Sequence, residues 1–206
     1  SKTDAEENFE IWLLSYKKFA LKQGISQKTI DIAFKNVKFL EQVIKYDRKQ
    51  PEFFEDTKTY VDKRANISRV KTARKLLKEN QILFTKVENK FSVEKEILLA
   101  LWGIETNFGQ HVGKMDIISS LATLSYDKRR RDFFSSQLLT LLNLIDEKLI
   151  NPNTLYGSWA GAYGNFQFMP SSIKHYAIDY DNNNKIELKS SLDDSLASAA
   201  NYINKI

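Results

Sequence analysis

The chain contains no cysteine, and only seven glycines, three prolines and two histidines occur among its 206 residues. Without cysteine there is no disulfide framework, thiolate nucleophile or cysteine zinc site, and His111 and His175 are too few for a histidine-rich site. No apolar run of about 18 residues is present. The opening SKTDAEENFEIW has neither the charged end nor the apolar stretch of a signal peptide. We therefore expect no membrane span and no retained targeting segment.

The charge balance is slightly basic. Lys and Arg number 31 against 26 Asp and Glu, which gives a net charge of +5. Such an excess can favour cell wall, nucleic acid or a membrane surface, but we interpret it as scattered surface lysines and expect no nucleic-acid partner. With 42% hydrophobic residues, the chain is long enough for one large core or two small lobes. The composition is that of a globular protein.

Few glycines and prolines, with apolar residues at intervals of three and four, predict a mainly α-helical fold. The stretch 151–191 is rich in glycine, aromatics, amides and hydroxyls, and we expect a shaped loop that carries binding residues. The last helical pattern has no stop signal, so we expect the natural chain to continue. Helices are predicted at 6–22, at 27–36 with Ser26 as N-cap, at 38–49, 52–64 and 68–90, from Ser92 to Gly109, at 131–148 and in 196–206.

One glutamate has a distinctive position on a predicted helix. Because apolar surroundings disfavour the charged form, a glutamate there can hold its proton near neutral pH and deliver it to a leaving oxygen, as a glycosidase acid must. The alternative is that this glutamate, near the helix end, reaches solvent or a neighbouring Lys or Arg. Glu105 shares one side of the helix with five apolar residues: Ile97, Leu98, Leu101, Ile104 and Phe108.

An acidic loop follows near the end of the chain. Asp179, Asp181, Asn183 and Lys185 occupy positions 1, 3, 5 and 7 of an EF-hand-like loop, whose alternate residues bring oxygens together. Position 7 supplies only a backbone carbonyl, so a lysine is permitted there. Ser190 replaces the glutamate expected at position 12. The pattern predicts either a structural Ca²⁺ site or an ordinary solvated Asn-Asp turn.

Several separate segments resemble, in the same order, the membrane-bound lytic murein transglycosylase B family. They are GIETNFG at 103–109, GKMDIISSLATLSYDKRRRDFF at 113–134 and GSWAGAYGNFQFMPSSIKHYAID at 157–179, followed by the acidic loop. The resemblance implies a mainly α fold, with a helical accessory lobe at 1–90 and a lysozyme-like catalytic core with an EF-hand-like loop at 91–206. The family's late tyrosine and asparagine have no counterpart here, which implies a core that is truncated at its C-terminus.

The resemblance also implies roles for individual residues. The family's catalytic glutamate corresponds to Glu105, the serine of its Gly-Ser-Phe-Ala-Gly segment to Ser158, and the glutamine of its Gln-Phe-Met-Pro segment to Gln167. Ser158 and Gln167 are expected to be ordered donors that hold the sugar's acetamido group. Phe168 and Met169 are expected to form an apolar wall of the sugar groove.

Other correspondences are looser. Tyr60, in YVDKR, fits a tyrosine that the family places in a Tyr-x-x-Lys context and that contacts the sugar. Phe166 stands where the family usually has glycine, and we expect it to change the loop's backbone or to fill part of the groove. The family's last metal ligand corresponds to Asp193. Alternatively, Ser158, Gln167 and Tyr60 merely satisfy backbone groups.

The implied activity is that of a peptidoglycan lytic transglycosylase with a single catalytic glutamate. Glu105 would protonate the oxygen between N-acetylmuramic acid and N-acetylglucosamine, and would then take the proton of the muramic acid 6-hydroxyl as a 1,6-anhydro ring closes. Nothing in the sequence distinguishes a second carboxylate at Asp116, Asp127 or Asp132 from surface acids, helix caps or ion-pair partners. No cofactor is expected for catalysis.

The resemblance further implies peptidoglycan strands as the main partner, with cell-wall synthesis or remodelling proteins besides. It places the protein in the periplasm, with an outer-membrane anchor on a longer precursor. Two rival functions remain. One is a module that binds glycan without cutting it, against which Glu105 argues. The other is a calcium-binding interaction protein, against which the single loop argues, since sensor EF-hands usually occur in pairs.

Overall fold

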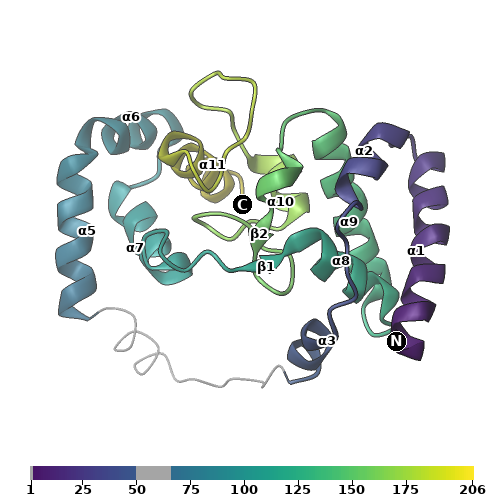
Figure 1. The fold of residues 1–206 in the computed structure, drawn as a ribbon. Helices are drawn as coiled ribbons and strands as arrows, with labels where there is room; N and C mark the ends of the chain where they lie inside the picture. The colour runs from purple at the N-terminus through teal and green to yellow at the C-terminus, as the bar shows by residue number, and fades with distance from the viewer. Residues whose placement is uncertain (1, 50–65) are drawn as a thin grey trace. The chain divides into compact units, whose positions relative to one another are not determined.

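The computed structural model describes residues 2–49 and 66–206, which are mainly helical (Figure 1). None of the helices in these two ranges is long and apolar enough to cross a membrane. The elements in chain order are α1 (Asp4–Lys22), α2 (Gln27–Ala33), α3 (Glu41–Arg48), α5 (Ile67–Glu79), α6 (Gln81–Phe91), α7 (Lys95–Thr106), β1 (Met115–Asp116), α8 (Ile117–Tyr126), α9 (Arg131–Asp146), the 3₁₀ helix η1 (Pro152–Thr154), β2 (Tyr156–Gly157), α10 (Pro170–Tyr176) and α11 (Leu192–Lys205).

Most of the predicted helices are confirmed, with ends that differ by a few residues. Ser26 caps α2 as predicted, since its hydroxyl accepts the N–H of Thr29 at 3.2 Å. The single helix predicted at 68–90 is instead two helices, α5 and α6. Asn80 separates them, and its side-chain amide donates to the carbonyl of Leu76 at 2.9 Å. The helix predicted at 52–64 lies outside the described residues.

Two helices were not predicted, α10 in the stretch assigned to a loop and α8 before it. Helix α8 is buried on all sides from Ile117 to Ser125, so its sequence shows no polar face. Two of its hydroxyl oxygens accept backbone N–H groups from an earlier segment of the same chain. Ser119 accepts the N–H of Lys38, and Thr123 accepts that of Leu40, both at 3.0 Å. These bonds satisfy backbone groups of the segment that leads into α3.

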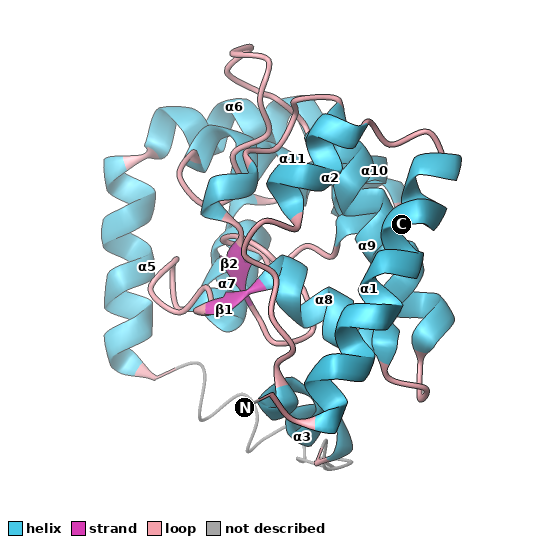
Figure 2. Cartoon of the chain, turned by 45° about the vertical axis from the view of Figure 1, so that its right-hand side comes forward, coloured by secondary structure: helices cyan, strands magenta, loops and turns pink. Residues whose placement is uncertain are grey.

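The described residues form two compact units, which we describe separately. Unit 1 contains 2–49, 113–163 and 169–174, and unit 2 contains 66–112, 164–168 and 175–206. In unit 1, α8 packs against α1, α3 and α9 (Figures 1 and 2). In unit 2, α6 packs against α7 and α11, and α5 covers α6 and α7. The boundary expected at residue 90 does not separate these units, because each takes segments from both sides of it.

A short antiparallel ribbon in unit 1 fixes the start of the glycine-rich loop. Met115 of β1 lies opposite Gly157 of β2. Gly113 has a φ of +91°, and a Cβ there would lie 2.2 Å from the backbone of Gly157. A Cβ on Gly157 would lie equally close to the carbonyl oxygen of Ala162. Only glycine permits these approaches, and they hold Ser158 directly after the ribbon.

Candidate active site

Glu105 lies in the last turn of α7, but the apolar face predicted around it is only partly buried. Ile97 and Ile104 are 43% and 37% exposed, and Glu105 is exposed beside them. The face of α7 that is actually buried differs from the predicted one by about one residue position around the helix. Trp102 and its neighbours fill the core of unit 2 instead. Glu105 therefore lies on an apolar strip that is open to solvent, rather than in the core. The buried residues of α7 are Leu98, Leu99, Trp102, Gly103 and Thr106.

Partial burial raises the pKa of the Glu105 carboxyl above its ordinary value. Among the residues that the structure describes, no hydrogen bond or ion pair opposes this shift. The alternative interpretation was that Glu105 reaches solvent or a neighbouring Lys or Arg. Glu105 is exposed to solvent, and no Lys or Arg pairs with it within the described residues. The carboxyl has the character of a proton donor rather than of an ion-pair partner.

The chain turns sharply after α7. Asn107, Phe108 and Gly109 all have positive φ, at 48°, 59° and 85°. The ring of Phe108 packs edge-on against Trp102, with centroids 5.5 Å apart. The hydroxyl of Thr106 accepts the N–H of Gly109 at 2.9 Å. These contacts make the helix end beside Glu105 a fixed position, which a catalytic side chain requires.

Asn165 ties this helix end to the rest of unit 2, and sequence reasoning missed it. Its side-chain oxygen accepts the indole N–H of Trp102 at 2.9 Å. Its amide nitrogen donates to the carbonyls of Leu188 and Lys189 at 3.1 and 3.2 Å, and contacts the hydroxyl of Ser195 at 3.1 Å. Asn165 is buried, and its only signal in the sequence is an amide within a glycine- and aromatic-rich loop.

Gln167 follows in the same loop with a φ of +55°. Its amide nitrogen donates to the carbonyls of Gly164 and Val112 at 2.9 and 3.2 Å. Both partners are acceptors, so the nitrogen must face them. Within the described ranges nothing donates to the amide oxygen, which leaves Gln167 an acceptor for a ligand. The expected donor role is therefore corrected, because the backbone already takes both N–H groups.

Ser158 lies in unit 1, at the start of a tight turn. Its N–H donates to the carbonyl of Ala162, whose own N–H donates to the Ser158 hydroxyl oxygen, both at 2.9 Å. The N–H of Gly161 donates to the Ser158 carbonyl at 3.1 Å. The serine thus satisfies backbone groups, as the alternative held. Within the described residues its hydroxyl only accepts, so the hydroxyl proton is not used there.

The remaining substrate candidates differ in their surroundings. Phe168 is 8% exposed and packs against Tyr202, with ring centroids 5.8 Å apart, so it belongs mainly to the core of unit 2. Met169 is half-buried in unit 1. Phe166, which was expected to alter the backbone or fill the groove, packs against the core of unit 2. Tyr60 lies outside the described residues.

Two of the three carboxylates considered as second catalytic groups have structural partners, and the third, Asp132, is exposed in the first turn of α9. Asp116 caps α8 by accepting the N–H of Ser119 at 2.7 Å. Asp127 pairs with Arg48 through two bonds of 2.8 Å, and this hydrogen bonding lowers the pKa of Asp127. Asp127 is therefore not suited to hold a proton near neutral pH, and Asp116 serves as a helix cap.

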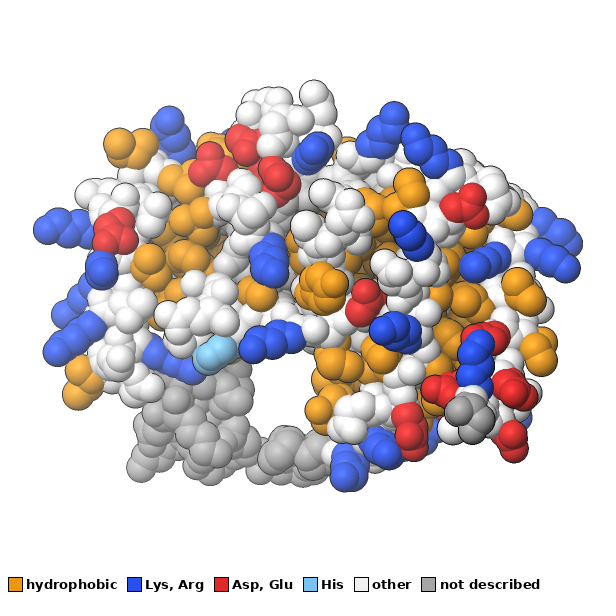
Figure 3. Space-filling view, in the orientation of Figure 1, with side chains coloured by type: hydrophobic (Ala, Val, Ile, Leu, Met, Phe, Trp, Pro, Cys, Tyr) orange, Lys and Arg blue, Asp and Glu red, His pale blue; other side chains and the backbone are white. Residues whose placement is uncertain are grey.

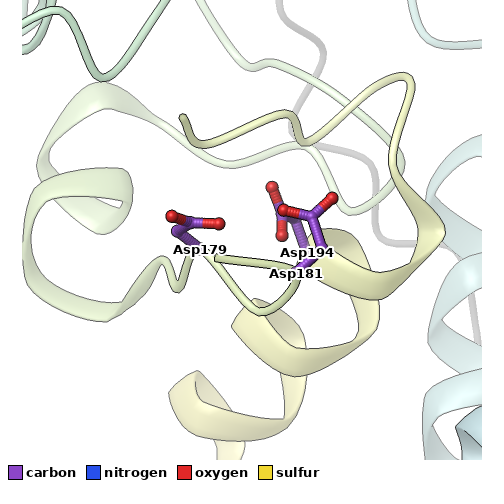
Figure 4. A group of neighbouring side chains, drawn as sticks. All are labelled: Asp179, Asp181 and Asp194. Atoms are coloured by element: carbon purple, nitrogen blue, oxygen red, sulfur yellow. The ribbon is translucent and has the colours of Figure 1, made fainter. Parts of the chain in front are cut away.

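The acidic loop brings three carboxylates together. Ligand oxygens of Asp179, Asp181 and Asp194 lie within 4.8 Å of one another. Figure 4 shows that Asp179 and Asp181 come from the loop and Asp194 from the first turn of α11. Acidic side chains also gather over this loop in Figure 3, whereas Lys and Arg are spread over the visible face. Such oxygens suit a hard cation such as Ca²⁺.

Asp194, not the predicted Asp193, completes this group. Its two oxygens accept the N–H groups of Tyr180 and Glu187 at 2.8 and 3.0 Å. Burial raises the pKa of Asp194, although these bonds act in the opposite direction. Successive helix residues point about 100° apart, and Asp193 is not among the carboxylates that lie together. The sequence alignment with an EF-hand does not specify which of two adjacent aspartates faces the loop.

Two of the other predicted ligands are exposed members of the loop. The Asn183 side-chain oxygen accepts the N–H of Lys185 at 2.9 Å, and the Asn183 N–H donates to Asp179 at 3.1 Å. The N–H of Asn184 donates to Asp179 at 2.7 Å. Asn182 and Asn184 have positive φ, which asparagine tolerates well. These bonds fold the loop around Asp179.

Known proteins resemble this chain in sequence and in fold. The model of the family described as "Transglycosylase SLT domain" matches residues 8–206. The chain is 42% identical over 113 residues to membrane-bound lytic murein transglycosylase B of Escherichia coli (strain K12), which covers 54% of this chain and 31% of that protein.

Solved structures are similar over almost the whole chain. SltB3 from Pseudomonas aeruginosa, in complex with NAG-NAM-pentapeptide, has a TM-score of 0.92 and 36% identity, over 96% of this chain and 53% of that one. The Escherichia coli lytic transglycosylase Slt35, in complex with calcium, has a TM-score of 0.79 and 31% identity, over 96% and 62%. The chain thus spans about half to two thirds of these structures and about a third of the curated relative. Its fold is the mainly helical, lysozyme-like fold of these enzymes, and the chain belongs to the transglycosylase SLT domain family.

Proposed function

We propose that this chain cleaves peptidoglycan as a lytic transglycosylase, with Glu105 as its acid and then its base. The observation that carries the proposal is the Glu105 carboxyl, which has a raised pKa, no partner among the described residues and a fixed place at the end of α7. Family membership supports it. SltB3 has been crystallised with both NAG-NAM-pentapeptide and NAG-anhNAM-pentapeptide, which are a substrate-like and an anhydro ligand.

In the proposed reaction Glu105 first gives its proton to the glycosidic oxygen as the bond from that oxygen to the anomeric carbon of N-acetylmuramic acid breaks. The 6-hydroxyl oxygen of the same sugar then bonds to the anomeric carbon, and its proton passes to the Glu105 carboxylate. Atoms balance without water, and Glu105 ends protonated. A raised pKa favours the first step because it keeps the acid form available. One carboxyl is enough because the nucleophile belongs to the substrate.

Other residues would hold the glycan. We propose that the Ser158 hydroxyl donates to a sugar oxygen and that the Gln167 amide oxygen accepts from a sugar N–H or hydroxyl, since these are the atoms that internal bonds leave free. Met169, the exposed edge of Phe168, and Tyr60 are proposed as further sugar contacts. The backbone bonds of Ser158 and Gln167 would fix both groups before the glycan arrives.

We propose Asp179, Asp181 and Asp194 as carboxylate ligands of a structural Ca²⁺, with Asn183 and the Lys185 carbonyl as further loop ligands. Slt35 was crystallised with calcium. Burial and the neighbouring Asp179 raise the pKa of Asp181, so a cation would relieve an unfavourable group of like charges. The ion would fasten the loop to the first turn of α11 and would take no part in the reaction.

The proposed place of action is the periplasm, where the partners would be peptidoglycan strands and proteins that build or remodel the wall. The curated relative is named membrane-bound, which is consistent with an anchor on a longer precursor of this chain. That anchor remains part of the proposal.

Mass analysis of muropeptides released from purified peptidoglycan tests the reaction. We expect 1,6-anhydro products, which are one water lighter than hydrolysis products. Glu105→Gln should lower turnover by about 100-fold or more, because the amide keeps the shape and loses the transferable proton. Products that have gained water would contradict the mechanism. Glycan binding by wild-type protein with no released product would instead favour the non-catalytic binding module.

A further inference from the structure

Two aromatic side chains lie together in unit 1 beside the turn that begins at Ser158. The rings of Trp159 and Tyr46 have centroids 6.3 Å apart and are inclined at 44°. Tyr46 is 43% exposed, and Trp159 is half-buried. A pair inclined in this way leaves part of each ring face uncovered. Neither side chain is needed for the proposed chemistry at Glu105.

The tyrosine is held on an anchored helix. Val43, one turn earlier in α3, is fully buried, and the Asp47 carboxylate is buried and contacted by Arg129 at 3.2 Å. The N–H of Leu40, just before the helix, donates to Thr123 of α8. Because Val43 and Asp47 anchor α3, Tyr46 is held at the edge of the buried face of the helix, where it stays partly exposed.

The tryptophan is held in an equally constrained turn. Two backbone hydrogen bonds among Ser158, Gly161 and Ala162, and a third from the Ala162 N–H to the Ser158 hydroxyl oxygen, close the turn around Trp159. Gly161 has a φ of +94°, and a Cβ there would lie 2.5 Å from the side chain of Leu121. The turn is thus packed directly on α8. Both rings are fixed before any ligand binds, which lowers the entropic cost of stacking on them.

We propose that Trp159 and Tyr46 form a stacking platform for an N-acetylated sugar ring of the glycan, next to the donor hydroxyl of Ser158. The proposal rests on the proposed function, and it adds a subsite to that function. Sugar rings have apolar C–H faces edged by hydroxyl and amide groups, so they fit an aromatic surface with a hydrogen-bond donor beside it. Trp and Tyr are also the side chains that most often dominate binding energy at recognition sites.

The test measures binding of N-acetylglucosamine oligomers, from dimer to hexamer, by calorimetry in the Glu105→Gln background, where the ligand stays uncut. Trp159→Ala and Tyr46→Ala should each weaken binding of the hexamer by about ten-fold, the loss expected when a stacking aromatic is truncated. Trp159→Phe and Tyr46→Phe should keep most of the affinity, because they keep a ring face. Phe19→Ala removes an equally exposed aromatic of unit 1, at 41% exposure, and should leave binding unchanged.

Tryptophan fluorescence gives a second readout that does not depend on the alanine variants being folded. Of the three tryptophans, Trp102 is buried and Trp12 packs among aromatic rings, so Trp159 should report the ligand. The emission change on hexamer binding should vanish in Trp159→Phe while calorimetric binding persists. If hexamer binding changes the emission of Trp159→Phe as much as it changes the emission of the parent protein, the platform is refuted.

Product analysis of the same variants without the Glu105 change separates the two proposals. Wild-type hexamer affinity in folded Trp159→Ala, together with 1,6-anhydro products from the wild-type protein, refutes the platform alone. Affinity that depends on the two rings, without any anhydro product, supports the platform and refutes the proposed reaction. A parent protein that binds no oligomer refutes the platform, whether the reaction occurs or not.

Discussion

At the scale of the residue, spacing in the sequence identified Glu105 but not its surroundings. Intervals of three and four placed the glutamate on one side of a helix with Ile97 and Leu101, and all three residues lie in α7. The core, however, is filled by the side centred on Leu98 and Trp102. A helix with apolar residues on more than half of its circumference has two possible inward faces, and packing volume rather than periodicity selects between them. This outcome leaves Glu105 accessible, as the proposed reaction on a polymer would require.

The raised pKa of Glu105 leads to a prediction about stability and pH. Below its ordinary pKa of 4.5 the carboxyl is protonated in folded and unfolded chains alike, and no cost arises. As the pH rises from 4.5 through the raised value, the folded state resists ionisation and loses stability. Glu105→Gln should therefore raise the thermal midpoint at pH 7 but not at pH 4. The gain should be below about 1 kcal/mol, because water screens an exposed group.

The matched control for this pH experiment is Glu96→Gln. Glu96 lies in the first turn of the same helix, where a negative charge is favourable, so its removal should lower the midpoint at pH 7. A midpoint that falls in both variants would show that burial does not destabilise the ionised Glu105.

Asn165 carries the second prediction at this scale. Asn165→Ala leaves the indole N–H of Trp102 and the carbonyls of Leu188 and Lys189 without their partner. Because each unsatisfied buried group costs about 1–3 kcal/mol, denaturant unfolding should show a loss of at least that size. Asn153→Ala, at an exposed asparagine in η1, should change the free energy of unfolding by less than about 0.5 kcal/mol. Equal losses of stability in the two variants would show that the Asn165 side chain does not hold the end of α7 to the rest of unit 2.

At the scale of the element, helices with one polar face were predictable and helices without one were not. Helix α1 has a capping box at Thr3 and a clear stop near Gly24, and its prediction was confirmed. Helix α8 is buried all round, and its Ser119 and Thr123 have partners far away in the sequence, so neither periodicity nor composition indicated it. The sequence pattern predicted the acidic loop up to Asn184. Which later aspartate joins Asp179 and Asp181 depends on how α11 begins, and only the fold determines that.

The presence of Asp194 rather than Asp193 in the acidic group gives a prediction in which the neighbouring aspartate serves as the control. A few millimolar calcium should stabilise the protein by about 1–2 kcal/mol if the site binds as weakly as extracellular calcium modules do. Asp194→Asn should abolish this gain, because it removes a buried ligand charge. Asp193→Asn, one residue earlier, should keep the gain. Thermal melts with and without calcium compare each variant with itself, so a general loss of stability cancels. A gain lost only in Asp193→Asn would restore the original sequence assignment.

At the scale of the whole molecule, the order of segments along the chain does not follow the order of the units. The chain passes from one unit to the other at residues 50, 112, 163, 168 and 174. Composition changes near residue 90, from a Lys- and Glu-rich stretch to the motif-bearing part, and this change suggested a boundary there. A change in composition reports which surface faces solvent and which residues carry function, whereas a compact unit is defined by shared burial.

This interleaving predicts that residues 91–206 will not fold as a separate catalytic core. The cut removes Phe84 and Val87, both with 0% exposure, from the core of unit 2, and it removes α1, α2 and α3 from unit 1. Loss of the buried Phe84 side chain alone costs about 3–5 kcal/mol, which approaches the whole stability of a typical domain. Purified 91–206 should therefore show weak, non-cooperative thermal unfolding by circular dichroism, while 1–206 unfolds with a sharp transition. Adding 1–90 in trans should restore part of the transition, because the missing helices then become available. A fragment 91–206 that melts cooperatively by itself would show that the boundary at residue 90 separates an independent core after all.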